Sequence, residues 1–425
     1  MVPRIVLFVF IVGILIRFIV APVAVMIYDA SFWAGTLDGL SSGKTIYETE
    51  FFYYPPVWGY ILSFMSLFLN AFGMSSFGSI FMEMQWSTSE LLLGTSLITN
   101  LEFNFVFKLP LFLADVLVAV VIFILVKRIT SDEKKASIAF SLWFLCPLVI
   151  WNSAFQGQFD SIMILMLALS VLMVFEKKYF FAGIFIALGT FTKVFPIIIV
   201  PLMIAYILSE SQNKEERLKN ISYGIIGFLT ITAILYIPLI MNGDLYNSFT
   251  FLFDRISNVN FGVSTSHPTA LTPTRENLVL FIPISFLISI LLALRMYKTK
   301  INREKTFIIL MVMTSCTLIM WPFVSYASQY GLFLIMPLIL ANSIIEKMKF
   351  PLHVVSLLFT FMVVVMMSLQ IFYPMPAYMN FGSFELINTS SIPMYGTLIW
   401  FMFIPGLYVF ITLLRNLLDK KEAIS

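Results

Sequence analysis

Apolar segments long enough to cross a membrane recur along the whole chain, and they limit what it can fold into. The first segment, Ile5–Ile27, has about 23 residues, and a helix of that length crosses the roughly 30 Å hydrocarbon layer of a bilayer. Several later segments are shorter, which predicts broken or partly inserted helices. These later segments lie at about 109–126, 137–153, 162–175, 179–192, 197–209, 221–241, 278–297, 306–323, 330–345, 353–372 and 394–414. The pattern predicts an all-α polytopic membrane protein with about twelve transmembrane helices.

The charge content supports this fold class. Only 12% of the 425 residues are charged and 60% are hydrophobic, whereas about a quarter of an average soluble domain is charged. So few polar side chains could not cover a water-facing surface, which excludes a soluble enzyme and a nucleic-acid binder and makes the lipid bilayer the expected partner. The two cysteines and two histidines provide neither a disulfide framework nor a metal-ligand spacing. No cofactor is assigned, and a divalent metal, although compatible with the chain, is not indicated.

The first apolar segment is interpreted as a retained span rather than a signal peptide. It is longer than the ~7–15 residue apolar core of a signal peptide, and no small-residue cleavage site follows it. Basic residues then orient the chain, because cytoplasmic loops collect Lys and Arg. They cluster in every second loop, with Lys127 and Arg128 as one example, which predicts that both termini are cytoplasmic.

Residues 28–107 are predicted to form one large external loop. Two crossings within 57–107 would make the segment between them cytoplasmic, yet that segment contains Glu83 and Glu90 and no Lys or Arg. No crossing is therefore preferred over two, and Val57–Leu69 is interpreted as an interfacial or re-entrant helix within the loop.

The whole chain, 1–425, is expected to be a single integral membrane module. After the first external loop, its parts are core helices at 108–241, a second external loop at 242–277 and C-terminal helices at 278–425. A charge at membrane depth costs roughly 2.5–3.5 kcal/mol on insertion scales, so isolated charges mark functional sites by default. Most of the isolated charges fall in the two external loops, which places the expected site on the external face.

Asp29 stands at the expected external mouth of the first span, with Trp33 one helical turn beyond it. A carboxylate in that position could accept the proton of a hydroxyl that reaches the membrane surface. The alternative interpretation is a solvated aspartate that caps a juxtamembrane helix. Asp38 lies nine residues further, on the opposite side of a helix, so it is given only a supporting role and no pairing with Asp29 is expected.

A tight external turn contains Gln156, Gln158 and Asp160. In an extended stretch their side chains would share one side, where amide and carboxylate groups suit sugar hydroxyls. Asp160 could also cap a helix that starts at Ser161. Tyr54 precedes two prolines, which indicates an extended segment that stops where a helix begins, and an aromatic belt at the membrane interface is the other interpretation.

Isolated basic residues are candidates for binding a phosphate group. Lys193 lies near the external end of a short span, where a lone cation either suits a phosphate at headgroup level or simply extends to the interface. Arg255, His267 and Arg275 lie in the second external loop, where a phosphate-binding role competes with an ordinary solvated loop.

Two further sets of polar residues complete the candidates. Lys108 and Asp115 are seven residues apart, which places them on roughly one face of a helix. They are expected either to support the site or to form a structural ion pair with each other. Gln329 lies in another short external turn, Trp321–Tyr330, which is rich in hydroxyl and amide groups.

The order and spacing of these motifs resemble the lipid-phosphate-sugar-dependent glycosyltransferases of the GT-C superfamily, and in particular prokaryotic relatives of the GPI mannosyltransferases. The resemblance covers about 28–205 and 325–340. The residues that carry it are Asp29, Gly43, Tyr47, Tyr54-Pro55-Pro56, Gln156-Gly157-Gln158-Phe159-Asp160-Ser161, Ala182-Gly183, Lys193, Pro196, Pro201, Ser328-Gln329-Tyr330 and Pro337.

The resemblance implies a multi-pass enzyme that takes a sugar, most commonly mannose, from a polyprenyl phosphate (dolichyl or undecaprenyl) and passes it to a glycan, glycolipid or protein acceptor. It implies Asp29 as the general base of an inverting attack. The leaving lipid phosphate would face Lys193, and Arg255 and His267 are further candidates that are chosen for their chemistry and not from a matched motif. The candidates for contacts with the sugar or the acceptor are Tyr54, Gln156, Gln158, Asp160 and Gln329.

The expected location is the plasma membrane of a prokaryote, or the endoplasmic reticulum if the chain is eukaryotic. The alternative function is a transporter or flippase for a lipid-linked or polar solute, a class that often shows pseudo-symmetric halves with interrupted helices. The sequence has no matched pair of broken helices, and its conspicuous polar groups are external, which favours the glycosyltransferase.

Overall fold

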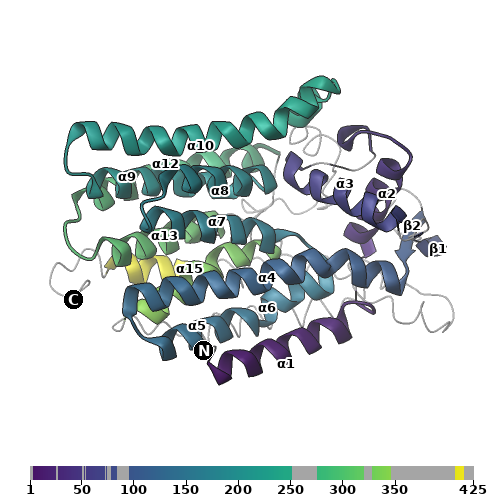
Figure 1. Ribbon diagram of the computed structural model, residues 1–425, viewed down its shortest axis with the longest axis horizontal. Helices are drawn as coiled ribbons and strands as arrows, with labels where there is room; N and C mark the ends of the chain where they lie inside the picture. Colours follow the sequence, from purple (N-terminus) through teal and green to yellow (C-terminus); the bar gives the residue numbers. More distant parts are fainter. Residues whose placement is uncertain are drawn as a thin grey trace, which may run out of the picture.

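The structure is a computed structural model that describes residues 3–24, 27–49, 52, 54–71, 73, 78–83, 95–250, 275–319, 328–345 and 407–415 (Figure 1). The described helices are α1 (Arg4–Val20), α2 (Ile27–Ser41), η1 (Ile46–Glu48), α3 (Pro56–Ala71), α4 (Leu101–Thr130), α5 (Glu133–Phe144), α6 (Pro147–Ile150), the π-helical η2 (Trp151–Gln156), α7 (Asp160–Phe175), α8 (Tyr179–Thr192), η3 (Phe195–Ile199), α9 (Val200–Glu210), α10 (Lys214–Met241), α12 (Arg275–Lys298), α13 (Arg303–Ile319), η4 (Ser328–Gly331) and α15 (Leu332–Ile344), with a further helical segment at 407–415.

Some of these helices have the length and composition of membrane spans. Within the described ranges α4 and α10 are long and apolar enough to cross a membrane, and α5 with α6 and η2 makes a third span if that bent pair is counted as one. The bend is 43° and lies just before Pro147. Proline has no backbone N–H to continue a helix, which explains the break. The described helices are therefore those of a membrane protein, and the expectation of a broken helix is confirmed.

The helices pack in successive layers, which run in Figure 1 from α10 at the top to α1 at the bottom. α10 packs on α8, α8 on α7, α7 on α4 and α4 on α5, which contacts α1. α15 packs against α5, α4 and α13, while α12 contacts both α13 and α9. Ile122 of α4 and Leu167 and Val171 of α7 are fully buried, because each helix covers an apolar face of its neighbour.

Glycines allow a close contact between α8 and α10. A Cβ atom on Gly183 would lie 1.9 Å from the backbone oxygen of Gly224. A Cβ atom on Gly227 would lie 2.0 Å from the backbone oxygen of Phe180. The two backbones therefore touch directly, as small residues allow in membrane helix pairs.

The segment predicted as the first external loop contains helices, among them the one expected near Val57–Leu69, and one feature that was not predicted. α2 and α3 pack on each other, and α3 starts at Pro56, where the double proline indicated a helix start. Strands β1 (Gly78–Glu83) and β2 (Thr95–Thr99) form an antiparallel pair, with β2 against α2. The part of the chain that the structure describes is thus helical, as predicted, apart from this one short strand pair.

The first apolar segment is not one helix up to residue 27. α1 ends at Val20 and α2 starts at Ile27, so Asp29 lies in the first turn of a second helix rather than at the end of the first. Pro22 lies in the turn after α1, where it lacks the N–H that would extend the helix. The single helix predicted over Ile5–Ile27 was therefore wrong.

α4 starts earlier than the segment assigned to the core helices. Its N-cap is Asn100, whose side chain accepts a hydrogen bond from the Phe103 N–H at 2.7 Å. Such a cap satisfies one of the unpaired donors at a helix start. Lys108 therefore lies well inside a helix and not at the end of a loop.

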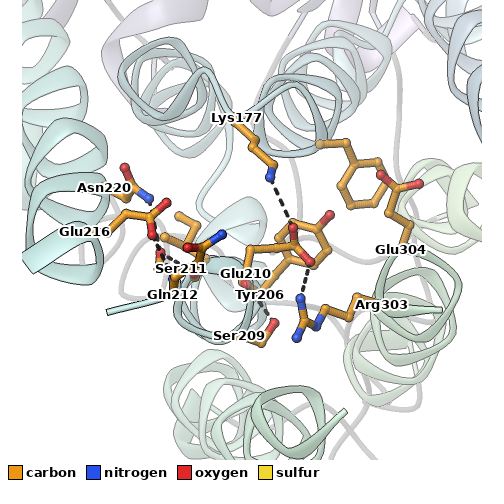
Figure 2. Close-up of polar contacts among 12 residues, drawn as sticks. Lys177, Tyr206, Ser209, Glu210, Ser211, Gln212, Glu216, Asn220, Arg303 and Glu304 are labelled. Carbon is orange, nitrogen blue, oxygen red and sulfur yellow. Dashed lines mark hydrogen bonds and ion pairs between the residues drawn. The ribbon is translucent and has the colours of Figure 1, made fainter. Parts of the chain in front are cut away.

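Charged residues at the ends of α4, α7 and α9 and at the start of α13 pair with one another. Glu210 accepts a hydrogen bond from Arg303 at 2.6 Å and faces Lys177 at 3.4 Å (Figure 2). Partial burial would raise the pKa of the Glu210 carboxyl, but the adjacent Arg303 and Lys177 together hold that pKa below its ordinary value. Arg128 similarly bridges Glu176 and Glu304. Basic residues of the expected cytoplasmic loops are thus neutralised by acids from neighbouring helices.

Candidate functional site

A buried ion pair joins the start of α7 to the end of α8. Lys193 Nζ donates to Asp160 Oδ2 at 2.7 Å. The Asp160 side chain is fully buried and that of Lys193 is 6% exposed. Each charge also matches its helix end, because Asp160 is the first residue of α7 and Lys193 is the C-cap of α8. Lys193 is thus enclosed by protein, which favours a role within a site over the alternative of a side chain that simply extends to the interface.

Three aromatic rings surround the Lys193 ammonium. Nζ lies 4.6 Å from the ring centroid of Phe159, 5.1 Å from that of Tyr330 and 6.0 Å from that of Tyr54. A cation within about 6 Å of a ring face is attracted by the π electrons. Among the described residues Asp160 is the one hydrogen-bond acceptor of this ammonium, which has three donors, so donor capacity remains for a ligand.

The aromatic rings tie α2, α3 and the segment between them to the turn before α7. Phe159 stacks on Trp58 of α3, with the ring centroids 4.6 Å apart and 11° between the planes. It also meets Trp33 of α2 at 5.7 Å and Tyr54 at 5.0 Å, both edge-on. Trp33 and Trp58 are fully buried. Motifs that lie far apart in the sequence therefore form one aromatic cluster beside the Asp160–Lys193 pair.

Several buried polar atoms in this region have no hydrogen-bond partner within the part of the chain that the structure describes. They are Asp160 Oδ1, Trp33 Nε1, Trp58 Nε1 and both side-chain amide atoms of Asn152. A buried polar atom left without a partner costs about 1–3 kcal/mol. Unpartnered donors and acceptors beside aromatic walls and an ion pair suit a ligand with hydroxyl groups and an anionic group.

The turn that carries Gln156, Gln158 and Asp160 is not extended. A π-helix leads into it, and one residue in it has a left-handed backbone conformation. Gln156 ends the π-helical η2, and Gly157 follows with φ of +72°. The Gln158 N–H then donates back to Asn152 O at 3.0 Å. The prediction that the three side chains share one side of an extended stretch was therefore wrong, because Gly157 reverses the chain in the left-handed region.

All three of these polar side chains are nevertheless buried, with relative exposures of 2% or less. Asp160 is not an N-cap: the cap position of α7 is Phe159, and no side chain caps this helix. The capping alternative was wrong, since the Asp160 carboxylate is directed to Lys193 instead.

Lys108 and Asp115 lie on α4 but do not form an ion pair with each other. Asp115 pairs with Arg17 at 2.8 Å. Lys108 Nζ donates to the backbone oxygens of Ala21 and Ala154, each at 2.8 Å, and to that of Ala24. The predicted ion pair was therefore wrong, although both side chains are fully buried.

The remaining predicted residues lie at the edge of the described site or outside it. Asp29 is placed in the first turn of α2, one turn before Trp33, and its side chain lies outside the described residues. Asp38 is exposed on the same helix. Arg255 and His267 lie outside the described residues, and Gln329 is described only as part of the backbone of η4. In the ranges that the structure covers, no group of three His, Cys, Asp or Glu residues could hold a metal ion.

Several members of the aromatic cluster were not among the predicted site residues. Trp58, Phe159 and Tyr330 were not candidates, yet all three contact Lys193 or the rings around it. Each lies within or next to a motif: Trp58 follows the double proline, Phe159 precedes Asp160, and Tyr330 follows Gln329. Aromatic residues in such motifs are a usable signal, because a desolvated cation is attracted to ring faces.

Comparisons with known proteins relate the chain to glycosyltransferases. The chain is 28% identical over 146 residues to GPI mannosyltransferase 1 of Candida albicans, which covers 32% of this chain and 36% of that protein. It is also 28% identical over 121 residues to GPI mannosyltransferase 1 of Saccharomyces cerevisiae, covering 28% and 30% of the two chains. The matched part is thus about a third of the length of these curated relatives. The pattern of glycosyltransferase family 87 matches residues 91–325, more than half of the 425 residues, and this range includes both Asp160 and Lys193. The chain belongs to glycosyltransferase family 87.

Proposed function

We propose that this chain transfers a sugar, with mannose as the first choice, from a polyprenyl phosphate carrier to an acceptor hydroxyl on the external face of a membrane. The carrier would be dolichyl or undecaprenyl phosphate, and the acceptor a glycan, a glycolipid or a protein. Family membership supports a sugar donor and a glycan or lipid acceptor, and the similarity to GPI mannosyltransferase 1 supports mannose.

The observation that carries the proposal is the Asp160–Lys193 pair inside its aromatic surround. The pair is buried, and its neighbours come from α2, from the segment before α3 and from η4. Oxygen acceptors, N–H donors and aromatic walls thus meet at one place, next to α2, the helix that carries Asp29 in its first turn. A binding pocket for a sugar phosphate needs this combination of apolar surface and a few convergent polar groups.

Asp29 is proposed as the general base. Its carboxylate would take the proton of the acceptor hydroxyl while that oxygen attacks C1 of the sugar from the side opposite the phosphate. The new C1–O bond forms as the bond from C1 to the phosphate oxygen breaks, and the lipid phosphate leaves with the electron pair. One displacement of this kind inverts the configuration at C1. The position of Asp29, one turn before Trp33 in α2, supports this role.

Binding roles are proposed for the other candidates. Lys193, with Arg255 and His267 of the second external loop, would stabilise the charge that develops on the lipid phosphate. Asp160 would remain bonded to Lys193 through Oδ2 and offer Oδ1 to a sugar hydroxyl. Asp38, Lys108 and Asp115 would support the site without contacting substrate. Further contacts with the sugar or acceptor would come from Tyr54, Gln156, Gln158 and Gln329.

The same proposal includes the membrane topology. The chain would cross the membrane about twelve times, with both termini cytoplasmic and the site external. The plasma membrane of a prokaryote is the proposed location, or the endoplasmic reticulum in a eukaryote.

The test is a transfer assay on the purified chain in lipid nanodiscs. Radiolabelled polyprenyl-phosphate mannose, and the corresponding glucose and galactose donors, would be incubated with extracted membrane glycolipids, and label in the acceptor fraction would be counted. We expect transfer from one donor, and a loss of at least about 100-fold in Asp29→Asn, because removing a general base costs on the order of 10²–10⁴-fold. The matched control is Glu102→Gln, which neutralises an exposed acid at the start of α4 and should leave transfer unchanged.

Two outcomes would contradict the proposal. Full activity of Asp29→Asn would exclude Asp29 as the base. Absence of transfer from every donor, together with solute uptake by the chain in proteoliposomes, would instead identify a transporter or flippase.

A further inference from the structure

Lys108 is a fully buried cation that no step of the proposed reaction uses. Its three bonds all go to backbone oxygens: Ala21 O and Ala154 O at 2.8 Å each, and Ala24 O. An ammonium group has three N–H donors and no acceptor, so all of its donors are satisfied. Lys108 therefore has no donor left for a substrate, and any role that it plays is exerted through the backbone that it holds.

Two of the three oxygens belong to the turn that leaves α1. The last carbonyls of a helix have no partner within it and form the negative end of the helix dipole, where a cation is favourable. Asn104, one turn before Lys108 on α4, adds a bond from Nδ2 to Pro22 O at 3.0 Å. One face of α4 thus fixes three carbonyl positions after α1, at Ala21, Pro22 and Ala24.

The third oxygen belongs to the segment that leads into the candidate site. Ala154 lies in η2, two residues before Gln156, and is fully buried. Gly157, which reverses the chain, lies against the same part of α4: a Cβ atom there would approach Phe107 at 2.6 Å and the Lys108 side chain at 3.3 Å. Lys108 therefore joins the exit of α1 to the turn that carries Asp160.

Each of the two anchored segments leads into a part of the proposed reaction centre. α2 starts at Ile27, three residues after Ala24, and carries Asp29 and Trp33. The anchored η2 leads to Phe159 and Asp160, and the ring of Phe159 meets that of Trp33 at 5.7 Å. Lys108 thus lies between the start of the segment that leads to Asp29 and the start of the segment that leads to Asp160. These two segments together form the proposed reaction centre.

We propose that Lys108 is a positioning residue for sugar transfer: by holding the end of α1 and η2 to one ammonium group, it sets the placement of Asp29 relative to the Asp160–Lys193 pair. The inference rests on the proposed function, and its effect is expected on the chemical step rather than on donor binding. A displacement of about 1 Å between reacting groups can cost on the order of 10²-fold in rate.

The test compares Lys108→Gln with the control Lys127→Gln in nanodiscs. Lys127 lies on the same helix, but it is exposed and pairs with Glu133 outside the site. Lys108→Gln should lower kcat by about 10–100-fold while the KM for the polyprenyl-phosphate sugar changes by less than about threefold. Hydrogen exchange followed by mass spectrometry should show faster exchange in peptides from α2 and from 151–160, with α13 unchanged. Lys127→Gln should match the unmodified chain in all these measurements.

A second variant covers the case in which Lys108→Gln fails to fold. Asn104→Leu removes the bond to Pro22, together with the bond that Asn104 accepts from the Thr99 hydroxyl, and keeps the buried cation. It should lower kcat in the same direction by a smaller amount, about 3–10-fold, and raise exchange in α2 but not in 151–160.

The outcomes separate this inference from the proposed function. A kcat within twofold of the unmodified chain, alongside faster exchange in α2, would show that Lys108 only stabilises the fold. A fall in kcat without any change in exchange would show that it acts on substrate, and would also overturn the inference. If the unmodified chain transfers no sugar, the proposed function fails and the catalytic part of the inference fails with it.

Discussion

Arg17 and Asp115 form a fully buried ion pair that joins α1 to α4. Arg17 Nη2 lies 2.8 Å from Asp115 Oδ2, and Nε donates to the same oxygen at 2.9 Å. The hydroxyls of Ser153 and Ser161 donate to the carboxylate at 2.6 Å and 2.5 Å, and the guanidinium lies 4.3 Å from the ring centroid of Phe144. A single carboxylate thus collects donors from α1, η2 and α7.

We expect Asp115→Leu to lower the free energy of unfolding by about 3–5 kcal/mol, because it leaves the Arg17 charge buried without its partner. Thermal and denaturant unfolding of the chain in detergent micelles would measure the loss. The double variant Arg17→Met with Asp115→Leu replaces the pair by apolar side chains, a change that is often near neutral. It should therefore be more stable than Asp115→Leu alone, and a double variant less stable than the single one would contradict the pair.

The contact between α8 and α10 predicts how a methyl group added at Gly183 changes the stability of the fold. In Gly183→Ala the new Cβ would lie 1.9 Å from the Gly224 backbone oxygen, which cannot rotate away as a side chain does. The helices must separate, and we expect a loss of about 1–3 kcal/mol in the free energy of unfolding. The control is Gly35→Ala in α2, where no atom lies within 4 Å of the new Cβ. That variant should be unchanged or more stable by up to about 1 kcal/mol, because alanine is the better helix former.

The sequence was sufficient to predict apolar helices, but not most of the contacts between them. Apolar runs predicted membrane helices, and the short runs correctly indicated a broken one. Asp160 and Lys193 were both singled out, yet their pairing depends on how α7 packs against α8, which no local pattern encodes. The turn at Gly157 was misassigned because alternating polar residues fit an extended stretch as well as a left-handed reversal.

Arg17 could have been identified as the partner of Asp115 from the energetic cost of an unpaired charge at membrane depth. Arg17 and Asp115 are single charges inside two separate apolar runs, and such charges are expensive at membrane depth unless they are paired. Pairing such charges with one of opposite sign would have assigned Arg17 to Asp115, rather than Lys108, because Lys108 precedes the apolar segment and Arg17 lies inside one. Nothing in the sequence predicts the hydrogen bonds of Lys108, because its partners are backbone oxygens, which every residue has.

The Glu210 pairs predict a pH dependence of stability (Figure 2). Because Arg303 and Lys177 hold the Glu210 pKa below the ordinary value of 4.5, this carboxylate stabilises the fold above that pH. The contribution is lost as the pH falls through the lower pKa of the folded state. The melting temperature should thus fall less between pH 6 and about pH 4 in Glu210→Gln than in the unmodified chain. Scanning fluorimetry across this range would check the sign, and an equal fall in both proteins would contradict it.

The Asp160–Lys193 pair predicts that its two members act as one unit in transfer. Lys193→Met should lower kcat/KM for the sugar donor by at least about 100-fold, because it removes a cation from the phosphate and leaves Asp160 without its partner. Asp160→Asn should cost a similar factor, and the double variant should be no worse than the poorer single variant, since groups that work together are not additive. Initial rates against donor concentration in nanodiscs would measure all three. Lys178→Met, at the exposed opposite end of α8, is the matched control and should keep full activity. If the loss in the double variant equals the product of the two single losses, Asp160 and Lys193 act independently, and their contact has no part in binding the donor.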